Sequence, residues 1–552
     1  MIMMDPLDIL TSFLKVHRSW MERSEEMNQR AIDLFRHLEE ATREEFPHLL
    51  ASELPREEKS DASEIFLEYV RKNAKLSRRF HSIFSDWQKG MVERSKDLND
   101  KDRQRALFWT QQVINALAPA NFFWTNPLAI KKFIETGGGS LTQGFSQAWE
   151  DYSRGDYLSR ITDEKAFKVG ENIAVTPGFV VFRNDLMEII QYEAATESTH
   201  AIPIVLVPPW INKYYIFDLT PQTSFVRFLR DQGFTVFVIS WKNPTAIMSD
   251  VSFADYMFTG VLKAVEAARH ICKVSHVHAA GYCIGGTALA ALMAWLNRKP
   301  GTKGHLPVAD WTLFSTLVDF SEPGDLGVFI SERSVEATEA LMKMDGYLDA
   351  RYLGWIFRIL GSDSLIWRNF VQNYLYGATP PKSDMLFWNS DSTRLPEAMC
   401  SFYLREFYLH NNLAKKDVLS LGNRLIDMGK VAQPLYAVGT QLDHICPWRG
   451  TFRTCSLLKS PRRYVLSSEG HITGIINPPS DGSRRKYWAG EVVQPEDPES
   501  WLSRQEEQRG SWWKDWTAWL VQRGSTIQNP PTMGSGKYPP LERSPGIYVT
   551  EN

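Results

Sequence analysis

A short glycine-rich turn that carries a cysteine constrains the fold of this chain more than any other feature. Residues 278–286 read His-Ala-Ala-Gly-Tyr-Cys-Ile-Gly-Gly, which is the Gly-x-nucleophile-x-Gly pattern of a nucleophile elbow with Cys283 in place of the usual serine. Such a turn links a strand to a helix in an α/β sheet, and its glycines let the two backbones approach closely. Residues 275–280 are a predicted strand and residues 287–296 a predicted helix. The alternative is a buried structural cysteine.

Short apolar runs alternate with helical stretches beyond residue 168. The runs have the length of buried strands and lie at residues 202–207, 234–240, 310–317, 433–438 and 463–467. Helices are predicted at residues 224–231 and 254–272. This alternation indicates an α/β fold with a doubly wound, mostly parallel sheet. The aromatic-rich residues from about 320 to 405 lack clear strands, so we expect them to form a cap inserted into the sheet domain.

The first part of the chain has a different pattern. Residues 7–117 are rich in charge and carry apolar side chains at helical spacing, with breaks near residues 54–55 and 99–101. We therefore expect a mostly helical N-terminal domain over residues 1–168 and a catalytic α/β domain over residues 169–552. The charged residues are expected on solvated helix faces. The apolar faces are candidates to dock a second subunit or a hydrophobic surface.

Composition limits the partners and the compartment. A net charge of −3 argues against bulk binding of nucleic acid. The five cysteines fit neither a disulfide framework nor a CxxC zinc site, so a reducing, cytoplasmic setting is expected. The N-terminus lacks a signal-peptide pattern, and no run of about 18 apolar residues predicts a transmembrane helix. His276 and His278 resemble a metal pair, but a structural role is favoured, and we expect no metal and no cofactor.

Partners for the cysteine are predicted from the order of groups along the chain. A cysteine nucleophile needs a base to form its thiolate and a group that orients the base. In this kind of fold the acid and the histidine follow the nucleophile, each in a loop after a later strand. Asp443 follows the strand predicted at residues 433–438, and His471 follows the one at 463–467. We therefore predict a triad of Cys283, Asp443 and His471.

An oxyanion hole needs two backbone N–H groups that point at the reacting carbonyl oxygen. Ile284, directly after the nucleophile, is expected to supply one. The other is expected from the loop after the strand at residues 202–207. Pro208 and Pro209 have no N–H to donate, so Trp210 or Ile211 must, and we favour Ile211.

Other residues near these loops are candidates for secondary roles. We expect His444, Trp210 and Asn212 to contact substrate, with His444 ranked behind His471 as a base because adjacency to Asp443 points it elsewhere. Cys446 also lies near the acid, but it lacks the elbow. The remaining cysteines are interpreted as structural.

Many long motifs, in order, resemble the polyhydroxyalkanoate synthases over most of residues 120–550. They include Glu135-Thr-Gly-Gly, Asn172-Ile-Ala-Val-Thr-Pro-Gly-Phe, Pro208-Pro-Trp-Ile-Asn-Lys-Tyr-Tyr, Gly281-Tyr-Cys-Ile-Gly-Gly, Phe387-Trp-Asn-Ser-Asp-Ser-Thr, Asp443-His-Ile-Cys-Pro-Trp, Gly470-His-Ile-Thr-Gly-Ile-Ile-Asn-Pro-Pro and Gly510-Ser-Trp-Trp-Lys-Asp-Trp. Pro208-Pro-Trp and Glu469 are mild departures from the family pattern that bear on substrate fit.

The resemblance implies an α/β-hydrolase fold and an acyltransferase that polymerises (R)-3-hydroxyacyl-CoA with release of CoA. It assigns Cys283 as nucleophile, His471 as base and Asp443 as the partner of the base. Class I enzymes, which favour short-chain substrates such as 3-hydroxybutyryl-CoA, are the nearest match, with class II as the competitor. The resemblance also implies a homodimer, with Trp388 in the cap and at the dimer contact, on the surface of the growing polyester granule in the cytoplasm.

Cysteine suits this chemistry because attack on a thioester gives another thioester of nearly equal energy. The acyl group therefore stays activated until the 3-hydroxyl of another unit attacks it. His471 and Asp443 both remain candidates to activate that hydroxyl. Two alternatives are kept: an acyl-CoA thioesterase with the same triad, and a granule-associated protein without activity.

Overall fold

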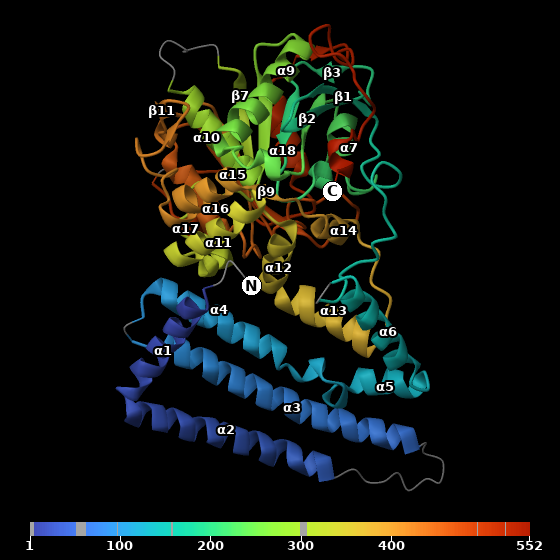
Figure 1. Cartoon of the computed structure of the whole chain (residues 1–552), viewed down its shortest axis with the longest axis vertical. Coiled ribbons are helices and arrows are strands. Elements are labelled where there is room, and N and C mark those ends of the chain that lie inside the picture. Colours follow the sequence, from blue (N-terminus) through green and yellow to red (C-terminus); the bar gives the residue numbers. More distant parts are fainter. Residues whose placement is uncertain are drawn as a thin grey trace. The chain divides into compact units, whose positions relative to one another are not determined.

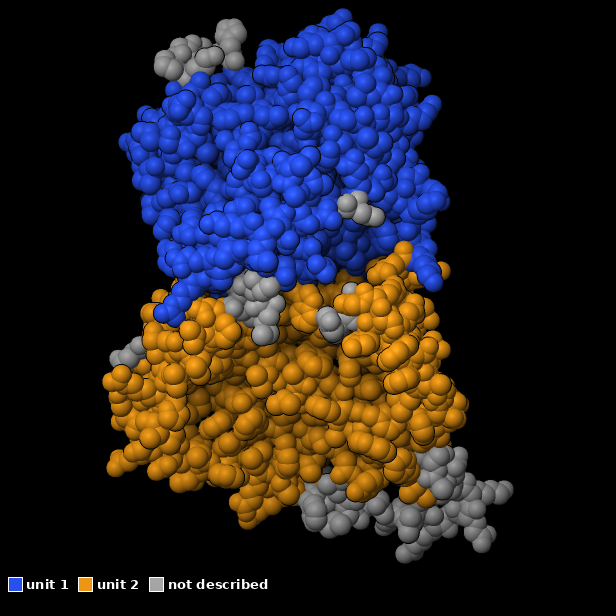
Figure 2. Space-filling model, viewed as in Figure 1, with its two compact units in different colours: residues 1–3, 165–354, 384–552 blue, residues 4–164, 355–383 orange. Residues whose placement is uncertain are grey.

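The computed structural model describes residues 5–50, 62–96, 98–155, 158–298, 306–493, 495–524 and 526–551. The chain divides into two compact units (Figure 2). The sheet unit contains Lys165–Gly354 and Asp384–Asn552, and the helical unit contains Met4–Glu164 and Trp355–Ser383. Among the described residues, no helix is both long and apolar enough to cross a membrane.

Ten strands of the described chain form the main sheet of the sheet unit. In spatial order they are β1 (Gly178–Arg183), β2 (Met187–Tyr192), β5 (Val236–Trp241), β4 (Ile204–Val207), β6 (Val277–Tyr282), β7 (Val308–Phe314), β12 (Leu435–Thr440), β13 (Arg462–Ser467), β14 (Lys486–Glu491) and β15 (Gln508–Arg509). Strands β5 through β13 pair in parallel, and the strands outside them pair antiparallel. This strand order is that of the α/β-hydrolase fold, which confirms the predicted fold class.

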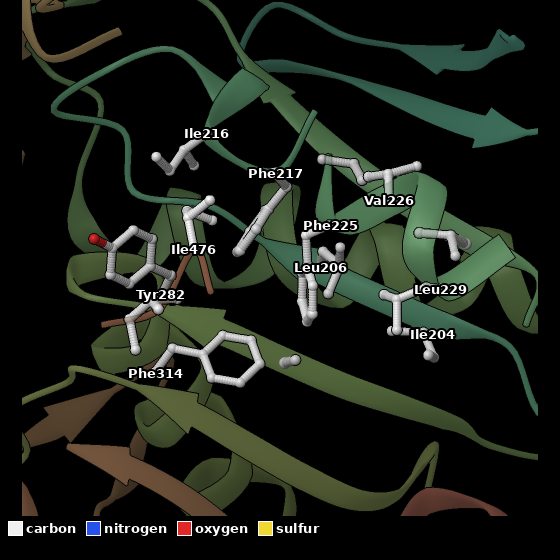
Figure 3. Packing of buried hydrophobic residues seen from close by; sticks show 14 of the residues in the cluster. Ile204, Leu206, Ile216, Phe217, Phe225, Val226, Leu229, Tyr282, Phe314 and Ile476 are labelled. Carbon is white, nitrogen blue, oxygen red and sulfur yellow. The ribbon is translucent and has the colours of Figure 1, made fainter. Parts of the chain in front are cut away.

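Helices cover both faces of the sheet, so the central strands are buried along their length. One face packs against α7 (Phe225–Asp231) and α18 (Trp513–Val521), and the other against α9 (Lys263–Cys272) and α10 (Ile284–Leu296) (Figure 1). Strands buried on both faces read as unbroken apolar runs, which is why they were predictable from sequence. Figure 3 shows the α7 side, where Phe225 packs beside Phe314 and Phe217 lies near Tyr282, the residue before Cys283.

Shorter elements complete the sheet unit. They are the helices α8 (Phe253–Asp255), α16 (Trp448–Leu457) and α17 (Pro498–Ser503), and the strand pairs β3 (Thr199–His200) with β16 (Ile527–Gln528), β8 (Tyr347–Leu348) with β9 (Leu395–Pro396) and β10 (Ser420–Leu421) with β11 (Arg424–Leu425).

The segment between β7 and β12 is mostly helical and contains the predicted cap. Its helices are α11 (Glu332–Asp345), α12 (Ala350–Leu360), α13 (Arg368–Phe370), α14 (Asp384–Ser390) and α15 (Glu397–Phe402), followed by a π-helical stretch, Tyr403–Leu409. We expected one cap over about 320–405 within the catalytic domain. The structure instead groups Trp355–Ser383 with the helical unit, where Tyr374 donates a hydrogen bond to Asp151 at 2.8 Å. The domain boundary at residue 168 remains a prediction.

The helical unit consists of amphipathic helices, as predicted. They are α1 (Pro6–Met21), α2 (Ser24–Leu50), α3 (Ala62–Glu93), α4 (Asp100–Ala116), α5 (Pro127–Glu135) and α6 (Gly139–Ser153). The predicted break at residues 99–101 is confirmed, because Asn99 caps α4 by accepting a hydrogen bond from the Asp102 N–H at 2.8 Å. The break expected at residues 54–55 lies outside the described residues.

Candidate active site

Cys283 lies in a sharp turn between β6 and α10, as the elbow pattern predicts. Its backbone has φ 52° and ψ −125°, a conformation that residues other than glycine rarely adopt. A Cβ on Gly281 would lie 2.5 Å from the Cα of Gly286, and one on Gly285 would lie 2.5 Å from the carbonyl oxygens of Val207 and Pro208. The glycines are therefore required by close backbone approach, and the loop after β4 is held against the first turn of α10.

Asp443 and His471 are brought together from two loops at the carboxyl ends of β12 and β13. The Nδ1–H of His471 donates to Oδ2 of Asp443 at 2.7 Å. The other carboxylate oxygen, Oδ1, accepts hydrogen bonds from the backbone N–H groups of Ile445 at 2.9 Å and Cys446 at 2.8 Å. Burial alone would raise the pKa of Asp443, but His471 and these N–H groups outweigh it and lower the pKa. Asp443 is therefore a fixed anion.

His471 lies partly buried against the strand that carries the nucleophile. Its ring stacks on Tyr282 with centroids 5.3 Å apart, and the Tyr282 hydroxyl donates to the His471 carbonyl oxygen at 3.0 Å. Burial disfavours the imidazolium, but the charges of Asp443 and Cys283 outweigh it and raise the pKa of His471 to about 10. The ring is therefore held in a single orientation and is able to carry a proton at neutral pH.

The thiol of Cys283 is correspondingly acidic. A hydrogen bond from the Cys446 thiol is the largest influence, burial opposes it, and the charge of His471 adds to it, so the pKa of Cys283 falls well below its ordinary value. The backbone N–H of Ile284 also acts on the sulfur in this direction. A thiolate–imidazolium pair is the form that this geometry favours.

Cys446, which the sequence analysis set aside as a nucleophile because it lacks the elbow, lies next to Cys283 and His471. Its Sγ, the Cys283 Sγ and a ring nitrogen of His471 all lie within 4.8 Å of one another. Cys446 is only 4% exposed, and the contact with Cys283 raises its pKa. The sequence signal for this contact was that Cys446 lies in the same loop as Asp443. The Asp443 carboxylate bends that loop back toward the elbow.

Two tyrosines from the π-helical stretch Tyr403–Leu409 lie beside the nucleophile. The hydroxyl of Tyr403 is 3.2 Å from that of Thr287 in α10. Burial raises the pKa of both Tyr403 and Tyr408, and the charge of Cys283 raises each further. Their rings lie near each other, with centroids 5.9 Å apart. This aromatic cover extends past the predicted end of the cap at residue 405.

The predicted oxyanion loop is tied to the segment that follows α14. The carbonyl oxygens of Trp210 and Ile211 accept hydrogen bonds from Thr393, at 2.5 Å from Oγ1 and 2.8 Å from N respectively. The N–H of Ile284 acts on the Cys283 sulfur, and its role as an oxyanion donor stays a prediction. The donor role of Ile211 stays a prediction.

The residues expected to contact substrate have other partners. The indole of Trp210 is buried and stacks on Tyr256 with centroids 4.3 Å apart. The side-chain amide of Asn212 donates to the carbonyl oxygen of Trp388 at 3.3 Å. His444 is exposed and interacts with Asp325. Their substrate roles stay predictions.

Trp388 is fixed inside the sheet unit. Its indole N–H donates to the Lys213 carbonyl oxygen at 2.6 Å, and its side chain is 4% exposed. A part of Trp388 in a dimer contact stays a prediction. The His276–His278 pair is likewise engaged: His278 is buried with its Nδ1 2.8 Å from a carboxylate oxygen of Asp310, and His276 contacts Ser275.

Sequence comparisons with known proteins agree on a family. Residues 71–229 match the family model described as "Poly-beta-hydroxybutyrate polymerase (PhaC) N-terminus". The chain is 39% identical over 474 residues to a poly(3-hydroxyalkanoate) polymerase subunit PhaC of Rhizobium meliloti, covering 86% of this chain and 76% of that protein. It is 41% identical over 455 residues to the PhaC subunit of Cupriavidus necator, covering 81% of this chain and 76% of that protein. Among solved structures, a Paleococcus ferrophilus monoacylglycerol lipase matches with a TM-score of 0.33 and 13% identity, over 61% of this chain and 99% of that one.

Proposed function

Because the chain belongs to the poly(3-hydroxyalkanoate) polymerase family, we propose that it makes its polyester through an acyl thioester on Cys283, with His471 and Asp443 as catalytic partners. The observation that carries this proposal is the 2.7 Å hydrogen bond between His471 and Asp443, next to a cysteine of lowered pKa in a strained elbow. An (R)-3-hydroxyacyl-CoA supplies the acyl group, and CoA is the leaving group.

In the first half-reaction the Cys283 thiolate attacks the thioester carbonyl carbon. The oxygen becomes an oxyanion, which the Ile284 N–H stabilises, and one such donor contributes about 3 kcal/mol to transition-state stabilisation. The C–S bond to CoA then breaks, and the proton held on His471 passes to the departing sulfur. The product is an acyl-Cys283 thioester and free CoA.

In the second half-reaction the 3-hydroxyl of another acyl unit attacks the acyl-Cys283 carbonyl. We assign the base to His471, because the carboxylate of Asp443 is already engaged by two backbone N–H groups, by Thr440 at 3.0 Å and by His471. His471 takes the hydroxyl proton, the Cys283 thiolate leaves, and an ester bond remains. Tyr403 and Tyr408 exclude water, which would otherwise hydrolyse the intermediate.

We assign a short-chain substrate, such as (R)-3-hydroxybutyryl-CoA. The aromatic rings of Phe320, Tyr403 and Tyr408 lie close together on the Cys283 side of the cap, with Phe320 5.8 Å from Tyr403 and 5.0 Å from Tyr408 between centroids. Close-packed rings leave little room for a long acyl chain. A higher kcat/KM for octanoyl-length than for butyryl-length 3-hydroxyacyl-CoA would contradict this assignment.

We assign the surface of the polyester granule, in the cytoplasm, as the place of action and a homodimer as the working form. The helical unit offers an apolar surface for such a contact: Phe145, Trp149 and Tyr152 follow one another at helical spacing on α6 and are 72%, 61% and 61% exposed. Exposed aromatic side chains in such a row suit a hydrophobic surface. Dimerisation is checked by sedimentation with and without substrate.

The granule contact is tested with the double variant Phe145→Ser/Trp149→Ser. We expect weaker binding to polyester particles and an unchanged initial rate of CoA release. Ile247→Ser, which removes an apolar side chain 93% exposed in the sheet unit, is the matched control and should bind as the unmodified chain does. Equal binding by all three proteins would remove this surface from the proposal.

The activity is tested with (R)-3-hydroxybutyryl-CoA, following CoA release and the form of the product. Polymer with stoichiometric CoA is expected, and Cys283→Ala should abolish both. Soluble 3-hydroxy acid without polymer would support the thioesterase instead. No CoA release at any acyl length would support a granule protein without activity.

A further inference from the structure

The site contains one thiol more than the proposed polymerisation uses. Cys283 and Cys446 come from the elbow and from the loop after β12, and their sulfur atoms lie within 4.8 Å of each other. Cys272, Cys400 and Cys455 are also buried, but the group of neighbouring ligand atoms that contains Cys283 includes none of them. Cys446 is therefore the cysteine whose thiol lies next to the Cys283 thiol.

The position of Cys446 is fixed by the triad itself. Its backbone N–H donates to Oδ1 of Asp443 at 2.8 Å, while Oδ2 of the same carboxylate holds His471. One anion thus orients both the base and the second cysteine toward Cys283. Because the side chain is buried, only small molecules that reach Cys283 can reach it.

We propose that Cys446 is a resolving cysteine, which closes a reversible disulfide with Cys283 when a small oxidant such as hydrogen peroxide enters the site. The proposal rests on the nucleophilic Cys283 of the proposed function. A disulfide needs sulfur atoms about 2.0 Å apart, so rotation about the Cα–Cβ bonds must close the remaining gap. Reversible disulfides form between cysteines when one thiol is acidic and reachable and the second thiol lies close to it.

The chemistry balances without any further reactant. The Cys283 thiolate attacks one peroxide oxygen, the O–O bond breaks, and the departing hydroxide takes the proton of His471 to leave as water. Cys283 is then a sulfenic acid. The sulfur of Cys446 attacks it, the S–S bond forms, and the thiol proton leaves with the hydroxyl group as a second water. Two thiols lose two electrons and one peroxide gains them.

The disulfide has two consequences for a thiolate enzyme. It stops polymerisation, because Cys283 cannot attack a thioester. It also protects Cys283 from oxidation beyond the sulfenic acid to the sulfinic and sulfonic acids, which thiol reductants do not reverse. Reduction by a small thiol restores both cysteines.

The test treats the full chain with hydrogen peroxide and reads both mass and activity. We expect the mass to fall by two hydrogen atoms, a proteolytic peptide that joins Cys283 to Cys446, and full recovery of the untreated rate after dithiothreitol. Cys446→Ser keeps a hydrogen-bond donor but cannot form the bond. Relative to its own untreated rate, it should lose activity irreversibly as Cys283 gains two or three oxygen atoms. Cys400→Ala, the matched control, should behave as the unmodified chain.

Peptide mapping keeps the proposal separate from the proposed function. If the protein released no CoA, the linked peptide would still form and the resolving role would stand. If Cys283 were oxidised to sulfinic acid at the same rate in the unmodified chain and in Cys446→Ser, with no linked peptide, the resolving role would be refuted whatever the activity. Linkage of Cys283 to any other cysteine would refute it as well.

Discussion

Replacing Asp443 by asparagine tests the electrostatics of the site with almost no change of shape. Oδ1 of Asp443 accepts from the N–H groups of Ile445 and Cys446, so the amide oxygen of an asparagine must take that place. The NH₂ group then faces Nδ1 of His471, which has to become an acceptor. The proton moves to the other ring nitrogen, and the ring presents a donor where the thiol needs a base.

The expected magnitude follows from the titration of His471. Its ordinary pKa of 6.5 rises to about 10 in the site, and one pKa unit corresponds to about 1.4 kcal/mol. The imidazolium is therefore favoured by about 5 kcal/mol net of the cost of burial, through the charges and hydrogen bonds of Asp443 and Cys283. If Asp443 supplies half, its loss costs about 2–3 kcal/mol, which is roughly a 30- to 150-fold fall in kcat.

Two assays read the change. Steady-state release of CoA from (R)-3-hydroxybutyryl-CoA gives kcat. The pH dependence of Cys283 alkylation by iodoacetamide gives the thiol pKa, and its midpoint should move upward, because a neutral His471 no longer favours the thiolate.

Asp427→Asn is the matched control. Asp427 is also buried and caps a turn, accepting from the Gly429 N–H at 2.9 Å, but it is not one of the groups that set the pKa of His471. An Asp443→Asn protein with kcat within about threefold of the unmodified chain, or with an unmoved alkylation midpoint, would refute the reasoning.

Three further predictions concern other parts of the sheet unit. Gly285→Ala should lower the free energy of unfolding by about 1–3 kcal/mol in denaturant titration, because the new Cβ meets two backbone carbonyl oxygens at 2.5 Å. The control is Gly354→Ala in helix α12, where a new Cβ has no atom within 4 Å and should not lower the free energy of unfolding. Equal effects of the two substitutions would contradict the close approach at Gly285. Cys446→Ala should move the alkylation midpoint of Cys283 to higher pH, more than Cys446→Ser does, since only serine keeps a donor; a downward shift would be inconsistent with the lowered pKa. Burial raises the pKa of Asp218 from 3.8 to about 6, so the contribution of Asp218 to stability is complete below pH 3.8 and is lost as pH rises through about 6. Asp218→Asn should remove this fall with pH from unfolding free energies measured across the same range. An unchanged dependence of the unfolding free energy on pH would count against this prediction.

The sheet and the order of the triad were predictable from sequence because each has a local signature. A buried parallel strand such as β4 is an unbroken apolar run, and the elbow glycines at 281 and 285 are required by contacts within a few residues or with the adjacent loop. Asp443 and His471 follow from the rule that loops after neighbouring parallel strands meet at one edge of the sheet.

What could not be predicted depends on packing between distant segments. Cys446 approaches Cys283 only because the Asp443 carboxylate bends its loop. The helical pattern of residues 355–383 does not reveal which unit they join. The packing of the Trp210 indole against Trp241 and Tyr256 also joins segments that are distant in sequence. Periodicity identifies an apolar face and leaves its partner undetermined.

The acyl group on Cys283 is the central claim, and trapping it tests that claim most directly. Butyryl-CoA can load the thiol but has no 3-hydroxyl to receive the next acyl group, so the acyl-enzyme should accumulate. Mass spectrometry of the digested protein should find one butyryl group on the peptide that contains Cys283, removable by hydroxylamine and absent from Cys283→Ala. A butyryl group on another residue, or release of CoA by Cys283→Ala at the unmodified rate, would contradict the account.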